Sequence, residues 1–151
     1  MWRWINGLWA FLYKRTSSSE TNAQKRGRYG ESVAARWLRQ QKGYTILARN
    51  WRQGRDELDL ICRDGRVIVF IEVKTRKADP LVPGYASVTR RKKAALRRVA
   101  KHYLRGLRPA PKHFRFDIVE VQLMEKGGFK VCHYENALLF SKYFHLDDFA
   151  S

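Results

Sequence analysis

The stretch DELDLICRDGRVIVFIEVKTR, residues 56–76, decides the fold because it predicts two strands joined by a tight turn. Asp64-Gly65 is a strong hairpin signal and lies between two runs of apolar residues. Successive side chains of a strand point to opposite faces, so with Asp64-Gly65 as the turn the hairpin has one apolar face and one mixed face. The apolar face, a predicted core face, comprises Leu58, Leu60, Cys62, Val67, Val69, Ile71 and Val73.

The mixed face places acids and a base among apolar side chains, and comprises Glu57, Asp59, Ile61, Ile68, Phe70, Glu72 and Lys74. In the predicted pairing Asp59 faces Phe70. Glu57 faces Glu72, which makes Asp59 and Glu72 diagonal neighbours with Cβ atoms about 7 Å apart. Two carboxylates at that separation can converge on one divalent cation, and Mg²⁺ takes one or two carboxylates together with several waters. Ordinary alternation of acid and base on an exposed strand is the structural alternative.

The mixed face suggests a chemistry for these residues. A Mg²⁺ or Mn²⁺ ion held by Asp59 and Glu72 would lower the pKa of a bound water and screen the charge that builds up during phosphodiester hydrolysis. Lys74, on the same face as Glu72, could orient the attacking water or stabilise the pentacovalent state. Glu31, on the inward edge of a helix predicted over residues 30–43, could add a third carboxylate.

The charge of the chain predicts a polyanionic partner. Thirty-one Lys and Arg against fourteen Asp and Glu give a formal net charge of +17 over 151 residues. The cations are spread along the chain, which favours nucleic acid over an anionic membrane or an acidic protein. A basic helix is predicted from Ser87, its candidate N-cap, to Gly106. The predicted nucleic-acid contacts are Arg76, Lys77, Arg90, Arg91, Lys92, Lys93 and Arg97; a merely solvated helix face is the alternative.

Further strands predicted over residues 44–52, 114–123 and 127–138 give the order αβββαββ, which is typical of an α/β domain with a mixed sheet flanked by helices in three layers. We expect a Trp-rich extension and polar linker over residues 1–28, the domain over residues 29–140 and a tail over residues 141–151. No run reaches the roughly 18 to 20 apolar residues of a membrane span, and we expect a cytoplasmic protein. The Trp-rich segment could pack on the core, lie on a membrane interface or be cleaved.

Several of these segments together resemble the YraN family, also called UPF0102: GESVAARWL, YTILARNWR, DELDLICRDGRVIVFIEVKTR and RFDIVEV. The resemblance runs from about residue 30 to residue 138. It implies a restriction-endonuclease-like PD-(D/E)xK fold, similarity to archaeal Holliday-junction resolvases, and a Mg²⁺-dependent nuclease site at Glu31, Asp59, Glu72 and Lys74. The family commonly has a Gln in the following helix, where this chain reads TRRKKAAL, with Lys92 or Lys93 as substitutes.

Two functions from different classes follow from these observations. The first is a metal-dependent DNA endonuclease acting on branched DNA, for which a homodimer would match the two symmetric strands of a junction. The second is a nucleic-acid-binding protein that retains the nuclease fold without cleaving. A third and weaker hypothesis is a DNA-processing factor anchored to a membrane by the Trp-rich segment.

Overall fold

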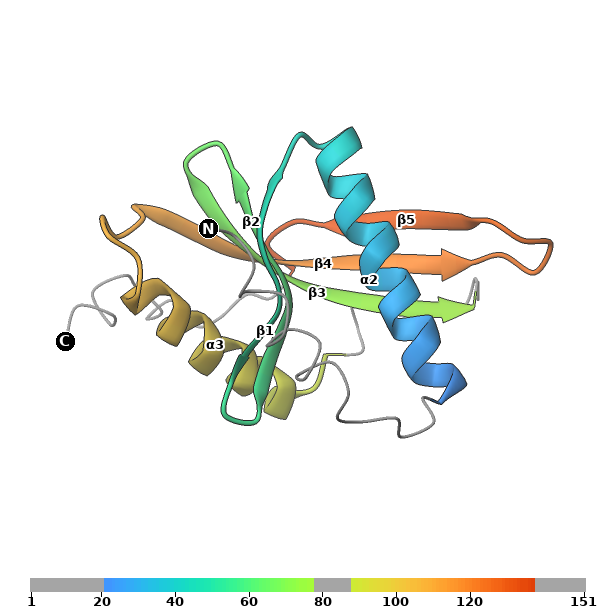
Figure 1. The fold of residues 1–151 in the computed structure, drawn as a ribbon, viewed down its shortest axis with the longest axis horizontal. Coiled ribbons are helices and arrows are strands. Elements are labelled where there is room, and N and C mark those ends of the chain that lie inside the picture. The colour runs from blue at the N-terminus through green and yellow to red at the C-terminus, as the bar shows by residue number, and fades with distance from the viewer. Residues whose placement is uncertain (1–20, 78–87, 138–151) are drawn as a thin grey trace, which may run out of the picture.

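The computed structural model describes residues 21–77 and 88–137, so the Trp-rich segment up to residue 20, the loop over residues 78–87 and the predicted tail lie outside the described part. Its elements run α2 (Asn22–Gln41), β1 (Thr45–Gln53), β2 (Asp56–Asp64), β3 (Val67–Lys77), α3 (Arg90–Arg105), β4 (His113–Leu123) and β5 (Phe129–Tyr134) (Figure 1). The predicted order αβββαββ is confirmed.

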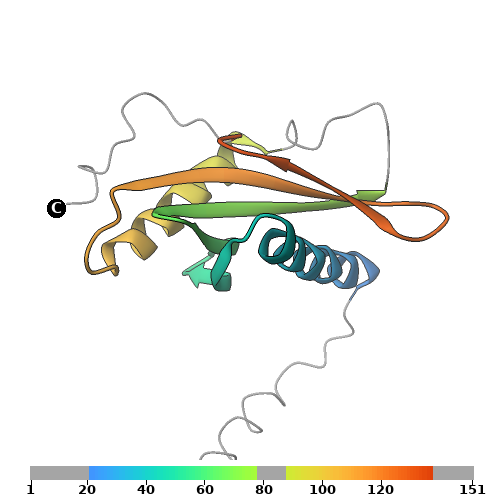
Figure 2. The ribbon, with the colours of Figure 1, turned by 90° about the horizontal axis from the view of Figure 1, so that it is seen from above.

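One five-stranded sheet, in the order β1-β2-β3-β4-β5, forms the middle layer. β3 and β4 are parallel, with α3 between them in the chain, and the other neighbours are antiparallel. The helices belong to two separate cores: α2 packs with alternate residues of β2, β3 and β4, and α3 packs with the intervening residues of the same strands. Figure 2 shows the sheet edge-on, with α2 beneath β3 and β4. The α/β class with a mixed sheet flanked by helices is therefore confirmed.

Helix α2 begins earlier than the sequence analysis predicted. Thr21 is its N-cap, and its hydroxyl and the Gln24 side chain form a reciprocal capping box. The prediction of a polar linker is therefore wrong for residues 22–28, which form the first turns of the helix. At Gly30 the helix lies so close to β3 that an added Cβ would be 1.7 Å from Thr75 Oγ1. Only glycine permits this approach, which brings the adjacent Glu31 to the sheet.

The register of the β2–β3 hairpin differs by two residues from the predicted one. Asp64 pairs with Val67, so Gly65 and Arg66 form the turn, and Gly65 has a φ of 55°. The predicted register is wrong, because Asp64 ends β2 and does not enter the turn. A slip of two residues keeps every side chain on its predicted face, and the face prediction holds except at Leu58, which packs with α3.

Leu58 changes side where the β1–β2 hairpin reorients towards α3. Its partner on β1 is Trp51, which contacts Tyr103 of α3 edge-to-face at 5.2 Å between ring centroids. Asn50, the residue before Trp51, has a left-handed φ of 48°, which turns β1 at this point. In Figure 1 the hairpin curls beside α3.

None of the described helices is both long and apolar enough to cross a bilayer.

Candidate functional site

Asp59 sits where β2 separates from β3. The paired positions of the two strands run from Leu60–Ile71 to Asp64–Val67. Beyond Leu60 the ladder between the two strands stops. There the Val73 N–H donates a hydrogen bond of 2.7 Å to the Asp59 side chain, at Oδ2, in place of a backbone carbonyl of β2. Asp59 is thereby fixed against β3 next to Glu72, and the prediction that it faces Phe70 is wrong.

The two carboxylates act on each other electrostatically. The pKa of Asp59 is raised to about 7, first by burial and then by the charge of Glu72, with a smaller contribution from Glu31. The Val73 N–H bond and the Lys92 ammonium oppose this rise. Acids with raised pKa values collect at functional sites, and here burial is the first cause and the neighbouring Glu72 carboxylate the second.

Glu72 is surrounded by cations of the chain. Its side chain is only 4% exposed, with Oε1 2.9 Å from Lys74 Nζ and Oε2 3.0 Å from Lys92 Nζ. Lys74 donates a hydrogen bond to Oε1, and both lysines form ion pairs with Glu72. Burial alone would lower the pKa of Lys92, but Glu72 outweighs it and the pKa is raised. Of the two candidate substitutes for the family's Gln, Lys92 is therefore the one at the site.

Glu31 lies at the margin of this pair. Its Oε2 accepts a hydrogen bond of 2.8 Å from Asn50 Nδ2, and it is the smallest of the causes that raise the Asp59 pKa. Within residues 21–77 and 88–137, no three Asp, Glu, His or Cys side chains are grouped so as to hold a metal ion. The predicted role of Glu31 as a third carboxylate ligand stays a prediction.

The Asp59–Glu72 pair fits a divalent cation by its chemistry. Both oxygens of Glu72 are held by ammonium groups, Lys74 at Oε1 and Lys92 at Oε2, and each oxygen has a further lone pair to offer. Asp59 is crowded by a like charge that a cation would neutralise. Mg²⁺ commonly takes one or two carboxylates and completes its octahedron with water, so two carboxylates suffice.

Arg76 and a residue that the sequence analysis missed, Glu120, form a second ion pair on the same face. Glu120 is 0% exposed, and its Oε1 accepts hydrogen bonds from Arg76 Nε and, at 2.8 Å, from Gln122 Nε2. Arg76, a predicted nucleic-acid contact, is a counter-ion of the buried Glu120 and has a quarter of its side chain exposed, so its contact with nucleic acid stays a prediction. Glu120 follows the buried Phe116 and Ile118 at every second residue of β4, on the same face of the strand. An acid in this row of core positions was the sequence signal that could have identified Glu120.

Most of the other predicted nucleic-acid contacts are exposed to solvent. Lys77, Arg90, Arg91 and Arg97 are exposed, and Lys93 is half-buried. Thr89, and not the predicted Ser87, is the N-cap of α3, and Gly106 ends the helix as predicted. Arg98 binds Asp56 through two hydrogen bonds of 2.8 and 2.9 Å, which ties α3 to the first residue of β2. Lys92, beside the acidic pair, thus shares α3 with the exposed Arg90, Arg91 and Arg97.

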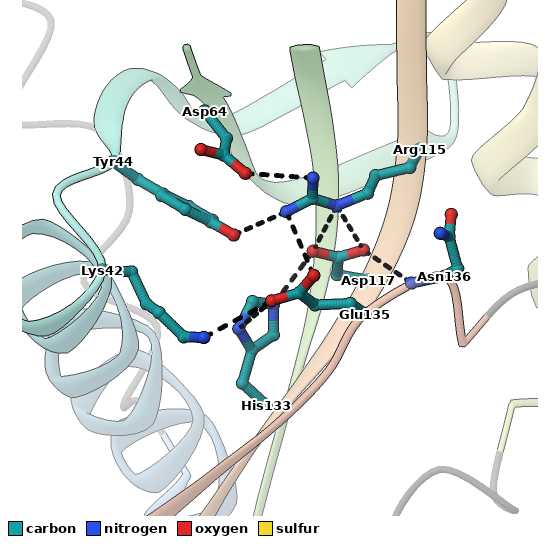
Figure 3. Close-up of polar contacts among 8 residues, drawn as sticks. All are labelled: Lys42, Tyr44, Asp64, Arg115, Asp117, His133, Glu135 and Asn136. Carbon is teal, nitrogen blue, oxygen red and sulfur yellow. Dashed lines mark hydrogen bonds and ion pairs between the residues drawn. The ribbon is translucent and has the colours of Figure 1, made fainter.

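The opposite face of the sheet carries a polar network around Asp117 (Figure 3). Asp117 is 0% exposed and accepts hydrogen bonds from Arg115 Nε, from the Asn136 N–H at 2.9 Å and from His133 Nε2 at 2.9 Å. Arg115 also donates to Asp64 at 3.0 Å and to the Tyr44 hydroxyl. The network joins β4 and β5 to Asp64 at the β2–β3 turn and to Tyr44 after the end of α2, which is a structural role.

Comparison with known proteins places the chain among relatives. The model of the uncharacterised protein family UPF0102 matches residues 30–121. The chain belongs to the UPF0102 family. A UPF0102 protein of Beutenbergia cavernae is 42% identical over 107 residues, which cover 71% of this chain and 90% of that protein. A UPF0102 protein of Porphyromonas gingivalis is 42% identical over 113 residues, covering 74% of this chain and 82% of that protein.

A solved structure shows a weaker likeness. Pyrococcus furiosus SfsA in complex with Ca²⁺ matches with a TM-score of 0.36 and 15% identity, covering 75% of this chain and 63% of that one. A score this low carries no conclusion about the UPF0102 chain. The UPF0102 match extends from Gly30 through the strand that bears Glu120, so the acidic pair, Lys74 and Lys92 all lie within the part of the chain that defines the family.

Proposed function

We propose that this UPF0102 protein is a metal-dependent DNA endonuclease that hydrolyses phosphodiester bonds in the cytoplasm, with branched DNA as its substrate. One observation carries the proposal: a pair of carboxylates, the half-buried Asp59 and the buried Glu72, lies beside the two lysines that contact Glu72, in a chain of net charge +17. Paired acids hold hard cations, and cations beside them suit a phosphate substrate. The same site thus has carboxylates for a metal ion and lysines for a phosphate.

Each residue then has a task in hydrolysis. Asp59 and Glu72 would hold a Mg²⁺ or Mn²⁺ ion, which when bound supplies an activated water and neutralises charge on the phosphate. Lys74 is held at Glu72 Oε1, where its ammonium can donate to a phosphate oxygen and stabilise negative charge in the transition state. The exposed Arg90, Arg91 and Arg97 would bind backbone phosphates and position the strand.

A non-catalytic nucleic-acid-binding protein is the second candidate. The observation in its favour is that Lys74 and Lys92 already contact both oxygens of Glu72. If these cations stay in place, the fold and the basic surface persist while no metal enters. Such a protein would bind branched or duplex DNA with the same salt dependence and would leave it intact.

Cleavage of labelled DNA distinguishes the two. The wild-type protein is incubated with a four-way junction and with duplexes of the same arm sequences, in Mg²⁺, in Mn²⁺ and in EDTA. Glu72→Gln tests the site, and Glu125→Gln, at an exposed residue of the β4–β5 turn, is the matched control. We expect the wild type and the control to cleave the junction in metal alone, with the loss of cleavage but not of binding in Glu72→Gln. Binding without cleavage in either metal would reject the endonuclease and leave the binding protein.

A further inference from the structure

Glu72 has more cationic neighbours than a metal-holding carboxylate can keep. Lys74 Nζ lies 2.9 Å from Oε1, and Lys92 Nζ lies 3.0 Å from Oε2. Both oxygens of Glu72 are therefore contacted by ammonium groups that belong to the chain. A divalent cation shared by Glu72 and Asp59 needs one of these oxygens, and an ammonium and a metal ion repel each other at such separations. A metal bound at either oxygen therefore competes with the lysine already there.

The geometry identifies Lys92 as the lysine that moves. Its Nζ lies 3.0 Å from the buried Oε2, whereas Lys74 donates a hydrogen bond of 2.9 Å to Oε1. Lys92 also acts on Asp59, the other acid of the pair. Lys92 thus lies where it neutralises both carboxylates, which is the position that a shared cation would take.

The movement can be confined to one side chain. Lys92 lies in the first turn of α3, where its N–H donates to the Thr89 hydroxyl at 3.2 Å and fixes the backbone. Its side chain is 32% exposed, so the ammonium has a route to solvent without any shift of the helix. Arg90 and Arg91 are exposed on the same turn. An ammonium released from Glu72 would join these cations at the surface.

We propose that Lys92 is a resident counter-ion of the Asp59–Glu72 pair, which a divalent metal displaces and which then faces the phosphate of the substrate. Lys92 stabilises the acidic pair in the metal-free protein and competes with the metal for the same oxygens. This proposal rests on the proposed function, because it assigns to Lys92 a positioning role in loading that site. It also explains how two neighbouring carboxylates are held together in the absence of metal.

Replacing Lys92 with Met tests the competition. Met keeps much of the length and apolar body of Lys and removes the charge. Lys126→Met, at an exposed residue of the β4–β5 turn, makes the same replacement away from the site. Binding of Mn²⁺ is measured by electron paramagnetic resonance and by calorimetry on each full-length protein, and melting temperatures are recorded in EDTA and in Mn²⁺.

We expect Lys92→Met to lower the Kd for Mn²⁺ about tenfold or more, which corresponds to about 1.4 kcal/mol. We also expect Lys92→Met to have a lower melting temperature than the wild type in EDTA. Its melting temperature should rise more on addition of Mn²⁺ than that of the wild type. Lys126→Met should match the wild type in every measurement. Equal or weaker Mn²⁺ binding by Lys92→Met would overturn the competition.

The two proposals fail in different ways. If the wild type and Lys92→Met bind Mn²⁺ equally and the wild type cleaves DNA, the endonuclease stands and the role of Lys92 is wrong. If only Lys92→Met binds Mn²⁺ and the wild type does not cleave, Lys92 is confirmed as the counter-ion and the endonuclease is rejected. If neither protein binds Mn²⁺, both proposals are rejected.

Discussion

Replacing Asp59 with Asn removes the ionisable group whose pKa is most informative about the site, and it keeps an oxygen for the Val73 N–H. A pKa of about 7 against an ordinary value of 3.8 corresponds to about 4 kcal/mol for ionising Asp59 in the fold. Because this group titrates together with Glu72, we expect about 2–4 kcal/mol in practice. Ionisation of Asp59 above its pKa therefore destabilises the folded wild type by this free energy, and Asn, which does not ionise, avoids the loss.

The pH dependence gives the effect its sign. The folded pKa of Asp59 lies above the unfolded one, so between about pH 4 and pH 7 the folded protein keeps a proton that the unfolded chain has released. Over that window the wild type loses stability as the pH rises. Asp59→Asn lacks this loss, so its advantage should grow from near zero at about pH 4 to about 2–4 kcal/mol above about pH 7.

The assay is urea unfolding in EDTA at a series of pH values. Asp56→Asn is the matched control with the opposite sign, because the hydrogen bond from Arg98 lowers the pKa of Asp56. That substitution should slightly destabilise the protein, and only above the ordinary pKa of an aspartate. If Asp59→Asn gave the same change in unfolding free energy at every pH, or no advantage above about pH 7, then Asp59 would not be a buried, crowded acid and the electrostatic description of the site would be refuted.

Three further outcomes follow from particular contacts. Arg76→Ala removes a counter-ion of the buried Glu120, so we expect a loss of about 3–5 kcal/mol in urea unfolding; a change below about 1 kcal/mol would contradict a stabilising role for this ion pair. Gly30→Ala places a Cβ 1.7 Å from the side chain of Thr75, and should cost about 1–3 kcal/mol, a loss that Thr75→Ala in the same chain partly restores and that an unchanged melting temperature would disprove. Arg91→Ala removes one exposed cation of α3, and the slope of log K for duplex binding against log salt should become shallower by about 0.9; an unchanged slope would place the DNA elsewhere.

Local patterns predict much of this fold. The order of elements, the mixed sheet and the apolar and mixed faces of the β2–β3 hairpin follow from periodicity, because a residue's side of a strand depends on its parity. The same parity explains why the two-residue error in the β2–β3 register changed the pairing of Asp59 but not the face that it shares with Glu72. The start of α2 could also have been found, since Thr21 and Gln24 have the spacing of a capping box.

Long-range contacts set the parts that the sequence could not supply. Asp64 ends β2 and does not enter the turn, where Arg115 from β4 binds it across the sheet, and no local pattern encodes that partner. Leu58 reaches the core of α3 because β1 turns at Asn50. Lys92 could be named only as one of two candidates, because the choice between adjacent lysines depends on how α3 is rotated against β3.

The central claim is that Asp59 and Glu72 together hold a divalent cation, and a crystal structure of the protein grown with Mn²⁺ tests it most directly. The account predicts an anomalous peak between the two carboxylates, with metal–oxygen distances of about 2.0–2.3 Å, and Lys92 Nζ withdrawn from Glu72. The absence of a peak there at saturating Mn²⁺, with both lysines still at Glu72, would contradict it.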